Sequence, residues 1–147
     1  MACYLRFLLT PAAADRLLAD WPFGRRRRPI AAAFPTKTVG VNVPVSDSVD
    51  DFSGQRSDAR RFLRRYARTI AALMKSRGVR SACLDFGVAD AIDGGRGPAV
   101  AMFFRFSPEL IELVARARLD LEFSVYPAAL PKKRRPSRKS AARAAGR

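Results

Sequence analysis

Short apolar runs, several of them alternating with polar residues, predict five strands in this chain. The predicted strands are residues 3–9, 36–45, 81–88, 99–106 and 119–126. The strand over 36–45 has the clearest pattern, because its four valines occupy every second position and so share one face. A glycine-rich segment over 90–98 is predicted to join the third and fourth strands as a hairpin.

Three segments carry helix signals, and the predicted helices are residues 11–20, 57–77 and 108–118. The first and third have proline at their first position, where its missing N–H costs nothing. Ser57 is expected to cap the long middle helix and Ser107 the last one, since a serine oxygen can accept from a free backbone N–H. Gly78 suits the left-handed conformation that follows many helices.

The order of these elements predicts an α+β fold. From residue 36 onward it is βαββαβ, the order of ferredoxin-like folds, preceded by an extra strand and helix. We therefore expect a mostly antiparallel sheet with helices packed on one face, in a single domain over residues 1–130. Residues 131–147 carry too little apolar surface to order themselves and are predicted to form a disordered basic tail.

The charge of the chain divides between these two parts. The 147 residues include 28 Lys or Arg and 13 Asp or Glu, a formal net charge of +15. The tail holds eight of the basic residues and no acid, which leaves +7 for residues 1–130. The tail is densest in charge at Lys132, Lys133, Arg134 and Arg135. Two readings stay open for it: an electrostatic arm for nucleic acid, or a solvated segment without a role.

The long helix predicted over 57–77 is basic on one side and apolar on the other. At 100° per residue, one arc of about 140° holds Arg60, Arg61, Arg64, Arg65, Arg68 and Lys75. The opposite side holds Phe62, Leu63, Tyr66, Ile70, Leu73 and Met74, which we expect in the core. Like charges three and four residues apart repel, and only Asp58 lies nearby to offset them. Either Asp47, Asp50 and Asp51 of the preceding linker or an external polyanion is expected to compensate.

Several kinds of chemistry are excluded or disfavoured. The chain has no histidine, which removes Ser-His-Asp and Cys-His catalysis and the usual zinc sites. Cys3 and Cys83 are too few for a disulfide framework, and Cys83 is expected as a small buried hydrophobe. A metal site at Asp85, Asp90 and Asp93 is disfavoured, because turn formation and solvent exposure explain these acids equally well. We expect no metal, no cofactor and no enzymatic activity.

Composition also bears on where the protein works. No apolar run approaches the roughly 20 residues that span a bilayer, and the apolar stretch after Arg6 is short for a signal peptide. Scarce cysteines favour a reducing compartment, so a cytoplasmic location is expected. The excess of arginine over lysine, 23 against 5, together with 25 alanines, is typical of GC-rich bacterial genomes.

The motifs of the chain bear on two families of known proteins. The RNA-recognition motif has the expected element order but needs stacking aromatics on its central strands, and Pro98 and Val100 stand at those positions here. A closer resemblance covers about residues 81–127. Its motifs are Leu84-Asp85-Phe86-Gly87, Pro108-Glu109-Leu110-Ile111 and Leu121-Glu122-Phe123-Ser124-Val125-Tyr126-Pro127. They resemble the C-terminal half of small uncharacterised bacterial proteins, some of them suspected partners of toxins; the resemblance implies no activity or catalytic residue.

These observations predict a binding protein that contacts an anionic partner through the arginine-rich helix face and the tail. Nucleic acid is the favoured partner, with weak, salt-sensitive and sequence-tolerant binding to phosphates. An immunity-like module that binds an acidic protein is the alternative, and an unrecognised enzyme comes third. The oligomeric state and the choice between DNA, RNA and protein stay open.

Overall fold

The computed structural model describes residues 2–24, 29–34, 37–48, 51–90 and 104–127 of the chain. Along the chain, the elements are β1 (Cys3–Leu9), α1 (Pro11–Ala19), β2 (Ile30–Phe34), β3 (Thr38–Pro44), α2 (Phe52–Met74), β4 (Val79–Asp90), α3 (Pro108–Ala117) and β5 (Asp120–Pro127). The predicted hairpin over 90–98, most of the strand predicted over 99–106, and the tail lie outside the described residues.

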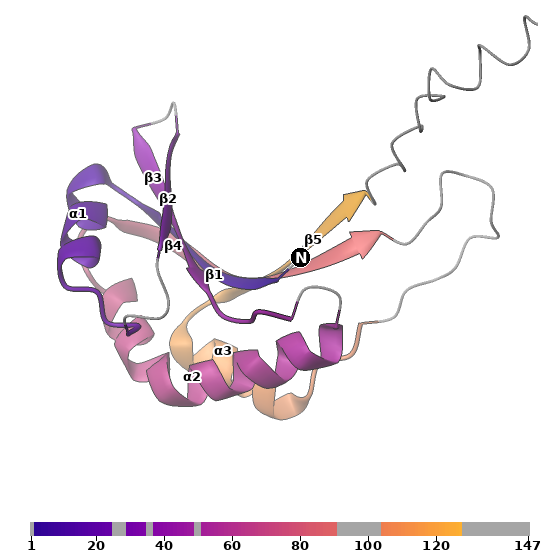
Figure 1. Cartoon of the computed structure of the whole chain (residues 1–147). Coiled ribbons are helices and arrows are strands. Elements are labelled where there is room, and N and C mark those ends of the chain that lie inside the picture. The colour runs from indigo at the N-terminus through magenta and orange to yellow at the C-terminus, as the bar shows by residue number, and fades with distance from the viewer. Residues whose placement is uncertain (1, 25–28, 35–36, 49–50, 91–103, 128–147) are drawn as a thin grey trace, which may run out of the picture.

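The strands form one curved sheet in the order β2-β3-β1-β4-β5 (Figure 1). Three neighbouring pairs are antiparallel, and β4 and β5 are parallel because α3 carries the chain back between them. The helices lie on one side of the sheet, with α2 and α3 packed against each other. The expected α+β architecture, mostly antiparallel with helices on one face, is therefore confirmed.

The strand positions differ from the prediction in three ways. β2 was missed, because its Ile-Ala-Ala-Ala-Phe sequence is rich in alanine, a poor strand former. β1, predicted as an extra strand before the βαββαβ unit, occupies the centre of the sheet between β3 and β4. Residues 104–106, predicted as the end of a strand, have no regular structure. Phe104 and Phe106 instead pack their rings against Phe52 and Phe123, and burial of these rings explains their apolar pattern.

The core lies between the sheet and the helices. Every second residue of β1 faces it, and Cys3, Leu5, Phe7 and Leu9 are almost fully buried. Two groups of aromatic rings extend this core: Phe23 with Phe7, Trp21, Phe62 and Tyr66, and Phe52 with Phe86, Phe104, Phe106 and Phe123. The apolar side of α2 is buried as predicted, with Phe62, Leu63 and Ile70 facing inward.

The helix α2 is longer at its start than the sequence predicted. It begins at Phe52, and its cap is Asp51, whose carboxylate accepts from Ser53 N at 2.9 Å. The prediction that Ser57 caps the helix was wrong, because Phe52 and Gln55 pack into the core and extend the helix toward its start. The buried Gln55 side chain donates to Gly87 O at 3.0 Å. After the helix, Gly78 adopts φ +96° as expected, and a Cβ there would lie 2.5 Å from Thr10 Oγ1.

Candidate anion-binding site

Most arginines of the predicted basic face are exposed on the surface of α2. Arg61, Arg64, Arg65 and Arg68 are exposed, the first with 79% of its side chain accessible. Arg60 is half-buried against α3. Lys75 follows the last residue of α2, seven positions beyond Arg68, which is about 10 Å along a helix. The predicted six-residue set is therefore a basic face, although its members are not equally available.

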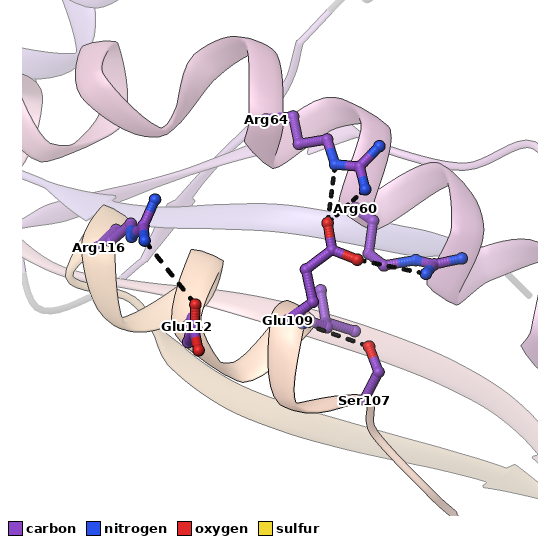
Figure 2. A network of polar contacts seen from close by, with 7 residues as sticks. Arg60, Arg64, Ser107, Glu109, Glu112 and Arg116 are labelled. Carbon is purple, nitrogen blue, oxygen red and sulfur yellow. Dashed lines mark hydrogen bonds and ion pairs between the residues drawn. The ribbon is translucent and has the colours of Figure 1, made fainter.

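Glu109, in the first turn of α3, occupies part of this basic face (Figure 2). Its carboxylate accepts from Arg64 Nε at 2.8 Å and from Arg60 Nη1 at 3.5 Å. The hydrogen bond from Arg64 is the main reason that the pKa of Glu109 is lowered from its usual value of 4.5. Two of the predicted anion-binding arginines therefore already hold a carboxylate.

The sequence located the counter-charges of this helix only in part. Asp58 pairs with Arg61 at 3.0 Å, as its position suggested. Of the linker acids, Asp51 caps the helix, and Asp50 lies outside the described residues. The missed partner is Glu109, which is 45 positions from Arg64 in the sequence and meets it only because α3 packs on α2. The sequence marked Glu109 only as part of the helix start at Ser107-Pro108-Glu109, and gave no sign of its contact with α2.

A hollow of about 460 Å³ lies between α2 and α3, and we call it the basic groove. Four arginines line it: Arg64, Arg65 and Arg68 from α2 and Arg116 from α3. Between them lie Leu63, Ala67, Ala71 and Leu113. Arg116 was not predicted, because its proximity to α2 depends on helix packing and not on spacing within one helix.

The four arginines of the basic groove differ in how strongly they are held. Arg64 binds Glu109, and Arg116 lies 3.8 Å from Glu112 on its own helix. The guanidinium carbon of Arg65 lies 5.2 Å from the ring centre of Tyr66, and Arg65 has no ion pair with any described residue. Arg68 has no ion pair with any described residue. Arg65 and Arg68 are thus the groups most open to an external anion.

The other predicted basic groups lie outside the described residues. This applies to Lys132, Lys133, Arg134 and Arg135 of the tail. Their contribution to anion binding stays a prediction.

Asp85 has a structural role on the side of the sheet that the helices leave open. It is 1% exposed, forms an ion pair with Arg6 Nη2 at 2.5 Å and accepts from Ser124 Oγ at 3.0 Å. Solvent exposure was one explanation offered for Asp85, and the structure instead buries its carboxylate against partners from two neighbouring strands. Within the described ranges, no group of acids and cysteines is arranged to hold a metal ion, and Asp93 lies outside them.

Cys83 is a small buried residue, as predicted. Burial, aided by a hydrogen bond to Glu122 and by nearby negative charge, raises its pKa to about 12. The group is therefore a neutral thiol at physiological pH, and the thiolate that acts as a nucleophile is not populated.

No protein-family model, curated protein or solved structure matches the chain. The resemblance over residues 81–127 therefore stays a prediction. Among the helices that the structure describes, none combines the length and apolarity needed to cross a membrane.

Proposed function

We propose that the protein binds nucleic acid through its phosphate groups, with the basic groove as the folded part of the interface. The observation that carries this proposal is the convergence of four arginines from two helices on one hollow. Guanidinium groups match phosphate oxygens in charge and in hydrogen-bond geometry. The tail residues Lys132, Lys133, Arg134 and Arg135 add charge and reach, and binding rather than catalysis is the activity.

Binding of this kind depends on salt and tolerates changes of sequence. The arginines line a hollow between two helices, and nothing in that arrangement presents a stacking aromatic or a base-reading amide to a ligand. The affinity then comes from release of counterions. Each phosphate contacted on duplex DNA adds about 0.9 to the magnitude of the slope of log binding constant against log salt concentration.

The test is a titration of labelled duplex DNA and single-stranded RNA at several salt concentrations. Arg65→Ala/Arg68→Ala removes the two most available groove arginines and is expected to weaken binding and reduce the salt slope on duplex by about 2. Arg77→Ala/Arg80→Ala is the control, because it removes the same charge from exposed positions near the start of β4. Equal losses in both variants, or binding unchanged at about 0.3 M salt, would overturn the proposal.

An acidic protein is the second candidate partner. The observation in its favour is the floor of the groove, where the half-buried Ala67 and Ala71 offer apolar surface that phosphate contact does not need. An acidic helix with apolar residues at helical spacing fits such a surface. Absence of binding to both nucleic acids, together with a toxin gene beside the coding sequence, would favour this partner.

We also propose a finer assignment of the fold. Residues 3–90 follow the order βαββαβ, and their strands lie in the order β4-β1-β3-β2, all antiparallel. This arrangement favours a ferredoxin-like unit at residues 3–90, earlier in the chain than the sequence suggested, with α3 and β5 added after it. A bacterial source and a cytoplasmic location rest on composition alone.

A further inference from the structure

β5 forms one edge of the sheet, and the other edge is β2. Within the part of the chain that the structure describes, β4 is the only strand paired with β5. The outer backbone groups of an edge strand can pair with another chain, and proteins commonly block such edges with lysine or an internal proline. The sequence of β5 is Asp-Leu-Glu-Phe-Ser-Val-Tyr-Pro, so it has no lysine, its proline is its last residue, and its charged residues are the two acids Asp120 and Glu122.

The end of β5 also projects beyond the body of the sheet. β1 pairs with β4 only as far as Cys3 opposite Phe86, whereas β4 and β5 stay paired to Asp90 opposite Pro127. Figure 1 shows the two strands extending together past the start of β1. A two-stranded ribbon has little stability by itself and gains from a further strand.

Apolar side chains gather along this edge. Among the described residues five large apolar side chains are exposed, and two of them, Phe123 and Val125, lie on β5. Val125 is 53% exposed and Phe123 37%. Phe123 and Val125 share the side of β5 that faces the helices, because they are two positions apart.

We infer that β5 is a homodimer interface, in which the β5 strands of two copies pair antiparallel about a two-fold axis. The strand is self-complementary in that arrangement. With Phe123 on the axis, Leu121 lies opposite Val125 of the second copy, and Glu122 lies opposite Ser124. Apolar residues then face apolar residues and no acid faces an acid, whereas an axis at Glu122 or at Leu121 would place carboxylates opposite each other.

The charge of the tails also favours the antiparallel arrangement. Each β5 leads at Pro127 into a tail with eight basic residues. With the axis at Phe123, the two Pro127 residues are separated by eight strand positions, about 26 Å. That distance exceeds the screening length of about 8 Å at physiological salt, so the tails start far enough apart to avoid strong repulsion. Parallel pairing would bring them together.

The test is sedimentation equilibrium of the full chain over a concentration series. The wild-type protein is expected to show a monomer–dimer equilibrium, and Val125→Lys is expected to weaken it at least about tenfold by placing a charge in the strand pair. Ile30→Lys is the matched control, because Ile30 is also a β-branched residue that is 53% exposed, but on the β2 edge. A wild-type monomer at all concentrations, or equal loss in the two variants, would overturn the inference.

The register is tested separately by cross-linking. Leu121→Cys and Val125→Cys chains are expected to cross-link through a short bismaleimide when mixed, and neither to itself, because residue 121 faces residue 125 of the other copy. The native Cys3 and Cys83 are buried and contribute little background. Cross-linking within the single-variant samples and none in the mixture would contradict this register.

Discussion

Glu109 is the residue that determines how much of the arginine-rich face is open to an external anion. Its carboxylate holds Arg64 and reaches Arg60, so it stands where a phosphate oxygen of a bound ligand would be attracted. We expect Glu109→Gln to tighten duplex binding by roughly two- to fivefold, because both arginines are released from an internal anion. Asp15→Asn is the control, because it removes the same charge from an exposed position on α1, outside the basic groove.

The same substitution has an effect on stability with a definite sign. The pKa of Glu109 is lowered in the folded state, so its ion pairs stabilise the fold above about pH 4.5 and this contribution is lost as the pH falls through the lower, folded pKa. Glu109→Gln should therefore lower Tm at pH 7, with a difference from wild type that shrinks in acid. Thermal unfolding at pH 7 and pH 3 measures this. A constant difference would mean that the carboxylate charge is not responsible.

Only some of the residues of this site could be predicted from the sequence. The basic face of α2 follows from helical spacing alone, and Ser107, Pro108 and Glu109 mark the start of α3. The ion pairs of Glu109 and the place of Arg116 in the groove were not accessible, because both depend on how α3 lies against α2. Local patterns predict what a helix exposes, while its charge partners come from tertiary packing.

Among the elements, the start of α2 offers a direct comparison between a sequence rule and the structure. Asp51 accepts from Ser53 N at 2.9 Å, whereas Ser57 lies inside the helix. Asp51→Ala is therefore expected to reduce the free energy of unfolding by about 1 kcal/mol. Ser57→Ala should change it by less than about 0.5 kcal/mol. Urea unfolding of the two variants checks this, with the exposed loop residue Asp47 changed to alanine as a control.

A larger loss in Ser57→Ala than in Asp51→Ala would place the start of the helix where the sequence pattern put it. The sequence pattern gave the wrong helix start because Ser57 precedes the arginine-rich stretch and has a side chain that is favourable at an N-cap. Phe52 and Gln55 override it, since the ring of Phe52 packs on Phe86 and the Gln55 amide bonds Gly87. Burial of these two side chains against β4 extends the helix by five residues, into a segment that is polar by composition.

For the molecule as a whole, the α+β class and the placement of helices on one side were predictable, and the order of strands was not. Alternation along 3–9 and 36–45 shows that these residues have one buried face. It contains no information on which strands are neighbours, and the central position of β1 arises from pairing with β3 and with the distant β4. The missed β2 shows the limit of the pattern for a strand of mostly alanine.

More than half of the net charge lies in the tail, so its contribution to binding can be separated from that of the folded part. Removing residues 131–147 takes away eight positive charges. If these residues form a separate arm, Tm stays within error of wild type. Duplex binding is expected to weaken, and its log–log salt slope to fall by at most about 7, because each phosphate contact contributes about 0.9. The binding that remains should then be sensitive to Arg65→Ala/Arg68→Ala.

The matched control keeps the tail at full length and replaces its lysines and arginines with glutamine. Equal effects of truncation and replacement would assign the loss to charge, since the two variants differ only in chain length. A lower Tm on truncation alone would show that the tail packs on the domain, against the predicted boundary at residue 130. Complete loss of binding in both variants would remove the basic groove as an independent site. Retained binding that depends on Arg65 and Arg68 therefore supports a folded site extended by a charged arm.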